Sequence, residues 1–174
     1  ATAIVKMLLE NSDQVHWCVR NEFVKGALEL RGHNPNYLTS VSFDVKKLAL
    51  TTDVNELVSA CDIVILAVPS IYLADTIEKM TVDYSNKLFV SAIKGIVPKH
   101  NDVVAHYLRD VFKIDCKNQG VIAGPCHAEE VAMERLSYLT IATPEKANAD
   151  ALKALIASDY IKVNCSKDIM GNEY

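Results

Sequence analysis

The chain has 174 residues, of which half are hydrophobic and 23% are charged, and its formal net charge is −4. This length suits one domain with a full hydrophobic core and is too short for two large domains. The small negative charge gives no global reason to expect nucleic acid or an anionic membrane as a partner.

The cysteines and the apolar runs exclude further classes of protein. The five cysteines are scattered, odd in number and form no C-x-x-C pair, so neither a disulfide framework nor a zinc site is expected. This cysteine usage favours a reducing, cytoplasmic location. The longest aliphatic run, Ile63 to Val68, is too short to cross a bilayer, and no secretory signal is visible. We therefore expect no metal, no nucleic acid and no membrane insertion.

The first half of the chain alternates predicted helices and strands. Asp53 and Glu56 are expected to cap the third helix. The patterns first predict a helix that ends near residue 11 and a strand at 15–19. A second helix follows and ends at Gly32, with Phe23, Val24, Ala27 and Leu28 on its inner face. Next come an irregular loop at 33–44, a short strand at 47–50, and a third helix with Val54, Leu57, Val58 and Cys61 facing inward.

Three short apolar strands dominate the second half. The segments 63–68, 88–93 and 120–123 are rich in branched residues and are predicted to be buried on both faces. Ser70 is placed to cap the helix after the first of them. The remaining patterns predict a helix through Val104, Tyr107, Leu108 and Val111, a helical turn within 127–134, strands at 138–142 and 161–163, and a helix at 144–157. Strands that alternate with helices in this way predict a doubly wound α/β domain with a mostly parallel sheet and helices on both faces.

Each of the three buried strands ends in a polar loop. These loops are Pro69-Ser70, Lys94-Gly95 and Gly124-Pro-Cys-His127. In an open parallel sheet, ligands bind beyond the carboxyl ends of the strands, so we expect the loops to share one edge. Lys94 would supply a mobile positive charge suited to a phosphate, and Gly124 would allow close approach to the backbone. The amides near His127 would favour an anion, whereas Glu129 and Glu130 are expected to cap the helix there.

The spacing of these motifs resembles that of the bacterial-type NAD(P)-dependent glycerol-3-phosphate dehydrogenases. The match rests on Ala67-Val-Pro-Ser70, Ala92-Ile-Lys-Gly95, Gly124-Pro-Cys-His-Ala-Glu-Glu-Val-Ala132 and Asp168-Ile-Met-Gly-Asn-Glu173, and it runs through the whole chain in order. The resemblance implies a Rossmann-type sheet and the interconversion of dihydroxyacetone phosphate and sn-glycerol 3-phosphate by hydride transfer. It also implies a supply of glycerol phosphate for phospholipid synthesis and leaves room for a homodimer.

The resemblance further implies the roles of individual residues. The family usually has a hydroxyl residue followed by an aromatic where this chain has Cys126 and His127. A thiol is a weaker hydrogen-bond donor than a hydroxyl, so that substrate contact is altered. Adjacent residues rarely face each other productively, which argues against Cys126 as a nucleophile with His127 as its base. The expected substrate-binding residues are Lys94, Gly124 and Cys126, and the expected cofactor-binding residues are Arg20, Tyr37, Pro69, Lys94 and Ala128.

Arg20 bears on the choice of nucleotide. A dinucleotide-binding fingerprint expects an acidic residue at the end of the second strand, where it binds the ribose hydroxyls of NAD. This chain has Arg20 there, and a guanidinium can hold a 2′-phosphate through charge-assisted hydrogen bonds. We therefore expect NADP(H) to be preferred, with NAD(H) as the second choice.

The resemblance also implies the domain organisation. Residues 1–174 would form the dinucleotide-binding domain, with Ala1 in the last place of G-x-G-x-x-G/A, and would lack the first strand and the glycine-rich turn. The helical substrate domain, with the lysine that accepts the proton, would begin beyond Tyr174. No catalytic residue is then expected within the chain, which alone should be inactive. Two alternatives are another dehydrogenase of the 6-phosphogluconate or 3-hydroxyacid type, and a nucleotide-binding module without catalysis.

Overall fold

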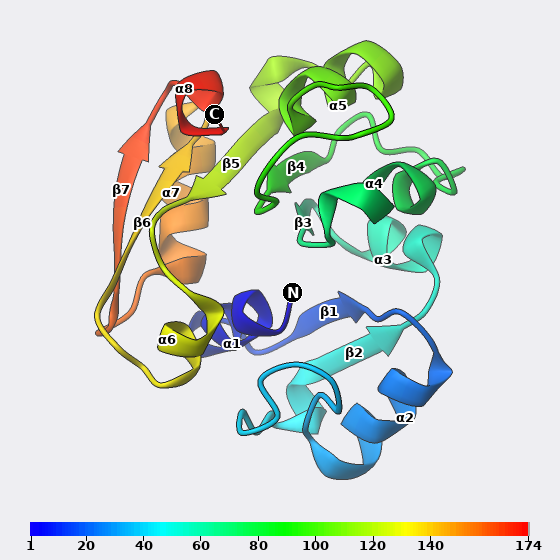
Figure 1. Cartoon of the computed structure of the whole chain (residues 1–174), viewed down its shortest axis with the longest axis vertical. Helices are drawn as coiled ribbons and strands as arrows, with labels where there is room; N and C mark the ends of the chain where they lie inside the picture. The colour runs from blue at the N-terminus through cyan, green and yellow to red at the C-terminus, as the bar shows by residue number, and fades with distance from the viewer. Residues whose placement is uncertain (174) are drawn as a thin grey trace.

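The computed structural model describes residues 1–173, in which helices and strands alternate along the chain (Figure 1). The elements are α1 (Thr2–Asn11), β1 (Val15–Cys18), α2 (Glu22–Arg31), η1 (Val45–Lys47), β2 (Leu48–Thr51), α3 (Val54–Ala60), β3 (Ile63–Leu66), α4 (Ser70–Ile77), β4 (Leu88–Ser91), α5 (Val104–Phe112), η2 (Cys116–Asn118), β5 (Gln119–Ala123), α6 (Ala128–Ala132), β6 (Ser137–Ala142), α7 (Lys146–Ile156), β7 (Ile161–Ser166) and α8 (Ile169–Glu173).

The strands form two sheets. One contains β1 and β2, and the other has the order β3-β4-β5-β6-β7. All neighbouring strands are parallel except β5 and β6, which are antiparallel. The exception arises because the connection between β5 and β6 holds only the five-residue α6, which contacts α1 and does not cross a face of the sheet. The prediction of a mostly parallel, doubly wound α/β fold is confirmed.

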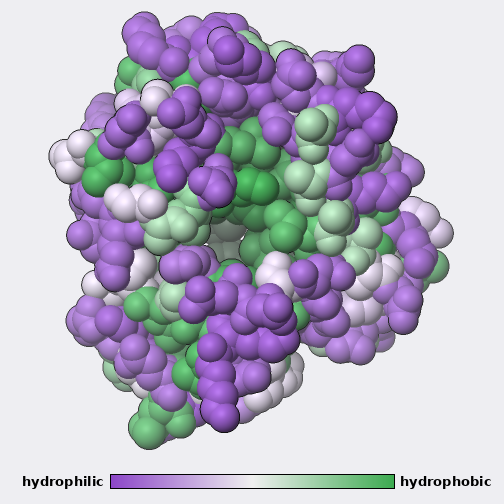
Figure 2. Space-filling model, turned by 180° about the vertical axis from the view of Figure 1, so that it is seen from behind, coloured by the Kyte–Doolittle hydropathy of each residue, from purple (hydrophilic) through white to green (hydrophobic). Residues whose placement is uncertain are grey.

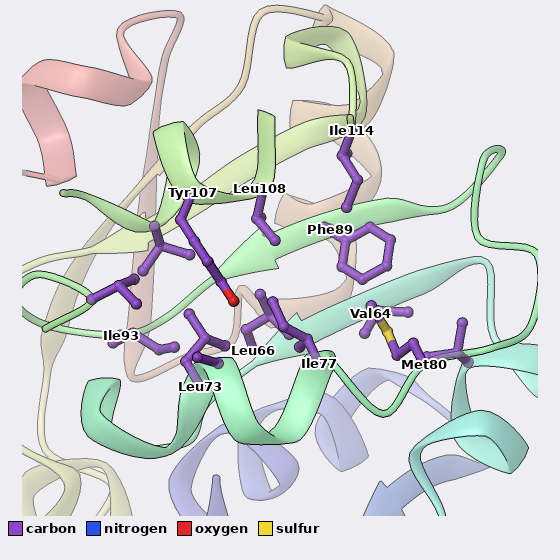
Figure 3. Packing of buried hydrophobic residues seen from close by; sticks show 14 residues of the cluster. Val64, Leu66, Leu73, Ile77, Met80, Phe89, Ile93, Tyr107, Leu108 and Ile114 are labelled. Carbon is purple, nitrogen blue, oxygen red and sulfur yellow. The ribbon is translucent and has the colours of Figure 1, made fainter. Parts of the chain in front are cut away.

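Strand β4 lies between β3 and β5 and is buried along its whole length, as its apolar sequence predicted. Phe89 points to one face, where it packs with side chains of α4 and α5, including Leu73, Ile77 and Leu108 (Figure 3). Leu88 and Val90 pack on the opposite face, in the cluster formed with α1 and α7. Fully burying one such side chain contributes roughly 1.5–3 kcal/mol.

Lys6 connects helix α1 to two segments that are distant in the sequence. Its Nζ bonds Glu134 Oε1 at 2.9 Å, the Tyr160 hydroxyl at 3.2 Å and Glu10 Oε1 at 3.3 Å. Burial lowers the pKa of Lys6, but these acceptors outweigh burial and raise that pKa above its usual value. The lysine therefore joins α1 to the segments before β6 and β7.

Two expected helix faces are partly wrong. The Phe23 side chain is 70% exposed, because α2 buries only Val24 and Leu28. Val111 is 43% exposed, and the neighbouring Phe112 packs against the core at the end of α5 instead.

Of the two expected helix caps, the one at Ser70 is wrong and the one at Asp53 and Glu56 is confirmed only for Asp53. Ser70 is the first residue of α4, which has Pro69 at its N-cap and no side-chain cap. Asp53 does cap α3 by accepting from the Asn55 amide at 2.8 Å, but Glu56 accepts a hydrogen bond from the Thr51 hydroxyl instead of completing the cap.

Membrane-spanning helices and metal-binding clusters would each indicate a particular class of protein. No helix among residues 1–173 is long and apolar enough to span a membrane. Within the same range, no three His, Cys, Asp or Glu side chains come together in a way that could hold a metal ion.

Candidate cofactor and substrate site

The three polar loops share one edge of the sheet. Strands β3, β4 and β5 are mutually parallel, so their carboxyl ends lie together, and the loops that follow contain Pro69, Lys94 and Gly124. The Ala92 amide donates to the Leu66 carbonyl at 2.9 Å and extends the pairing of β3 with β4 to this edge. The sheet therefore presents three candidate residues on the side where parallel sheets bind ligands.

Gly124 has no room for a side chain. Its φ is +148°, and a Cβ atom would lie 2.6 Å from the Tyr138 carbonyl oxygen on the adjacent strand β6. The close approach follows from the antiparallel return of the chain, which lays β6 against the end of β5. Glycine at this position lets the backbone of the loop lie directly against β6.

Lys94 and Cys126 follow two neighbouring parallel strands, β4 and β5. Lys94 is exposed beyond β4, and the next residue, Gly95, has a φ of +94° that favours glycine. Burial raises the pKa of the Cys126 thiol, and the charge of Lys94 opposes this rise only in part. Cys126 is therefore a neutral thiol at neutral pH, which fits a contact residue better than a nucleophile.

Helix α6 begins beside Cys126, with Ala128 as its first residue. Glu130 Oε2 accepts a hydrogen bond from the His127 amide at 3.2 Å, so the capping role expected of Glu130 is confirmed. The exposed Ala128 adds no side-chain bulk between this turn and a ligand.

Arg20 follows β1 and reaches across to α4. Its guanidinium carbon lies 5.8 Å from the centre of the Tyr72 ring, a cation–π contact that joins the end of β1 to the first turn of α4. Tyr72 was not singled out from the sequence. The available signal was an aromatic residue two positions after Ser70, just past the end of a buried strand.

Tyr37 lies in the loop after α2, and its side chain is 66% exposed. The loop is held by Asn34, another residue that sequence reasoning missed. The buried Asn34 side chain accepts hydrogen bonds from the amides of Asn36 (2.9 Å) and Tyr37 (3.3 Å), and it donates to Thr2 Oγ1 at 3.0 Å. This links the Tyr37 loop to the start of α1 near the site.

An apolar slot separates the two sheets. It has a volume of about 270 Å³ and lies between β1 and β3, with walls from α1, α3 and α4. Ile4, Trp17, Leu57 and Ile65 are among the residues that line it. Figure 2 shows a central hollow with hydrophobic walls inside a largely hydrophilic surface. Ile63 and Ile65 of β3 line this slot and are only half-buried, so the prediction that β3 is buried on both faces is wrong for one face.

The protein is an α/β domain of the Rossmann type. It has a doubly wound, mostly parallel sheet with helices on both faces, and the carboxyl ends of its strands carry Lys94 and the glycines Gly95 and Gly124. One protein family matches this sequence over residues 1–150, namely the family described as the N-terminus of NAD-dependent glycerol-3-phosphate dehydrogenase. The chain belongs to this family.

Curated relatives agree with this assignment, and solved structures share the fold. Glycerol-3-phosphate dehydrogenase [NAD(P)+] of Staphylococcus haemolyticus is 28% identical over 99% of this chain, and that of Latilactobacillus sakei is 25% identical. The chain spans about half of each relative, 52% of its length. The fold is similar to glycerol-3-phosphate dehydrogenase from Coxiella burnetii, with a TM-score of 0.86, 19% identity, and coverage of 99% of this chain and 52% of that one. The Plasmodium falciparum enzyme gives a TM-score of 0.84 with 23% identity, and covers 96% and 49% of the two chains.

Proposed function

We propose that the full-length protein containing this chain is an NAD(P)-dependent glycerol-3-phosphate dehydrogenase that interconverts dihydroxyacetone phosphate and sn-glycerol 3-phosphate. The observation that carries the proposal is the family match over residues 1–150, together with the meeting of its three loop motifs at one sheet edge. Such an enzyme would work in the cytoplasm and supply glycerol phosphate for phospholipids. Its assembly as a homodimer is part of the proposal.

Within that protein, residues 1–174 would be the dinucleotide-binding domain. The apolar slot between β1 and β3 supports the presence of a further strand there, contributed by a segment outside residues 1–174. A separate helical domain would complete the substrate site and supply the group that accepts the proton. The chain alone would then be inactive, and no residue within it is proposed to transfer a proton.

The cofactor would lie along the carboxyl edge of the sheet. The residues fit a dinucleotide because Arg20 and Lys94, which follow β1 and β4, are both exposed cations that can meet its phosphates. Arg20 would bind the 2′-phosphate of NADP(H), which makes NADPH the preferred cofactor. When bound, the nicotinamide supplies or accepts the hydride. The residues that would hold the cofactor are Arg20, Tyr37, Pro69, Lys94 and Ala128.

The substrate would lie between Lys94 and the loop that carries Gly124 and Cys126. The Lys94 ammonium would stabilise the charge that develops on the ketone oxygen, or hold the phosphate compound in register. The Cys126 thiol follows β5, next to β4 and Lys94, and would border the same space.

Kinetics of the full-length protein test the proposal. We expect dihydroxyacetone phosphate to be reduced with NADPH, measured as the loss of NADPH absorbance. Turnover with 6-phosphogluconate or a 3-hydroxyacid instead would favour the alternative class of dehydrogenase. Tight NADPH binding without turnover of any of these substrates would leave a nucleotide-binding module and would contradict the proposal.

A further inference from the structure

Glu173, at the end of α8, holds the start of α5 although it lies far away in the sequence. Its Oε2 accepts a hydrogen bond from the Ala105 amide at 2.9 Å, at an N-terminus where α5 has no side-chain cap of its own. The other carboxylate oxygen is buried and has no hydrogen-bond partner within residues 1–173. Burying a carboxylate oxygen without a hydrogen-bond partner costs free energy of folding, so its presence calls for an explanation.

The same carboxylate lies next to the end of β4. Burial raises the pKa of Glu173, whereas the Ala105 amide and the nearby side chains of Ser91 and His106 favour the charged form. Ser91 is the last residue of β4, and its Oγ accepts a hydrogen bond from the Ile93 amide at 3.3 Å. The Glu173 carboxylate therefore lies near Ser91, three residues before Lys94.

These contacts lie at the two ends of a single loop. Residues 92–103 connect β4 to α5, and Lys94 is in the first part of this loop. The second part closes on itself, since the Val97 amide donates to the Asp102 carbonyl at 2.8 Å and the His100 amide donates to the Val97 carbonyl at 3.0 Å. The first part, residues 92–96, is held near its start by the bond from the Ala92 amide to the Leu66 carbonyl and by the bond from the Ile93 amide to Ser91 Oγ.

We propose that Glu173 is a positioning residue that fixes the loop 92–103, and through it the Lys94 ammonium, by capping α5 at the Ala105 amide, where the loop ends, with its carboxylate beside Ser91, where the loop begins. The catalytic part of this proposal rests on the function proposed above. A displacement of about 1 Å in a catalytic group can cost up to a hundredfold in rate, so the attachment has a direct consequence for turnover.

The test uses the full-length protein with Glu173→Ala, Glu173→Gln and the control Asp115→Ala. Asp115 is also a carboxylate cap, accepting from the Lys117 amide at 3.1 Å, but it lies before β5 at the opposite edge of the sheet. In Glu173→Ala we expect amide hydrogen exchange in residues 92–103 to become at least about tenfold faster and kcat for dihydroxyacetone phosphate to fall by about tenfold or more. The glutamine variant keeps an acceptor for the Ala105 amide and should recover most of both, and Asp115→Ala should change neither.

A double-mutant cycle separates positioning from general destabilisation. If Glu173 acts through Lys94, then Glu173→Ala should cause little further loss of kcat in a Lys94→Met background, whereas independent effects would multiply. Unchanged exchange in residues 92–103 of a folded Glu173→Ala variant, or multiplicative losses in the cycle, would overturn the proposal. If the wild-type protein does not reduce dihydroxyacetone phosphate, the proposed function fails, and the exchange experiment still decides whether Glu173 fixes the loop.

Discussion

The five-stranded sheet has loops at the amino ends of its strands, called here the amino edge, and at their carboxyl ends, called the carboxyl edge. The two sets of loops are stabilised in different ways. At the amino ends of β4 and β5, short polar side chains satisfy nearby main-chain groups. Asp83 accepts from the Ser85 amide at 2.9 Å, and Asn118 donates to the Ser85 carbonyl at 3.2 Å. Loops of this kind use their polar side chains to stabilise their own conformation.

The carboxyl edge has glycines and an exposed cation instead. Gly95 and Gly124 have positive φ angles, and Lys94 is exposed and forms no ion pair within the described part of the chain. Such loops contribute less to their own stability and keep charge and space available for a ligand. The comparison predicts that changes at the carboxyl edge affect function and that matched changes at the amino edge do not.

The largest expected effect is that of Lys94→Met. Methionine retains the packing of the stem and removes the charge and its donors, so kcat/KM of the full-length enzyme should fall by roughly a hundredfold or more, with an unchanged thermal melt. Lys87 precedes β4 as Lys94 follows it, and Lys87→Met is the matched control at the amino edge, with near-normal kinetics expected. Equal kinetics for the two variants would show that Lys94 is only a surface lysine.

Gly124→Ala should have the next largest effect, on stability. The added methyl group would meet the Tyr138 carbonyl, and φ is +148°, so we expect a loss of roughly 1–3 kcal/mol in the free energy of unfolding, measured by denaturant titration. Gly26 in α2 has no positive φ, and a methyl group added there would meet no atom within 4 Å. Gly26→Ala should therefore be neutral or stabilising by up to about 1 kcal/mol. A neutral Gly124→Ala would mean that β6 can move away from this loop.

Arg20→Asp should change cofactor selectivity. Loss of charge-assisted hydrogen bonds to a 2′-phosphate should weaken NADPH binding by about tenfold or more, while NADH changes much less. Isothermal titration with both nucleotides checks this result. Arg31→Asp makes the same charge change at the end of α2 and serves as the control. Equal losses for both nucleotides in Arg20→Asp would remove Arg20 as a 2′-phosphate ligand.

Cys126 gives the smallest expected effect. A serine there restores a hydroxyl donor, so Cys126→Ser should keep activity within about fivefold of the wild type, on the scale of one neutral hydrogen bond. Because burial raises the pKa of Cys126, its thiolate fraction is low below that pKa, and iodoacetamide should label it more slowly than the exposed Cys116. Mass spectrometry between about pH 7 and pH 9 follows the labelling. Rapid labelling of Cys126, or a folded but inactive serine variant, would revive covalent catalysis.

The sequence predicted the features that depend on local pattern. The apolar runs of β4 and β5 predicted their burial, whereas β3 is fully buried on one face only, and the polar residues that follow the three strands predicted the shared edge. Features that depend on tertiary contacts were missed. Nothing near Glu173 in the sequence indicates that it caps α5, which begins almost 70 residues earlier, and the cation–π contact of Arg20 with Tyr72 joins the end of β1 to the distant helix α4. Phe23 was misplaced because helical spacing says which residues share a face but not how much of that face is covered.

Amide hydrogen exchange of the full-length protein, with and without NADPH, tests the role of the carboxyl edge most directly. The account predicts that NADPH slows exchange in residues 69–72, 94–96 and 124–128, which follow β3, β4 and β5, and leaves residues 83–87 and 113–118 at the amino edge unchanged. Protection at the amino edge alone, or no protection at either edge despite saturating NADPH, would contradict it.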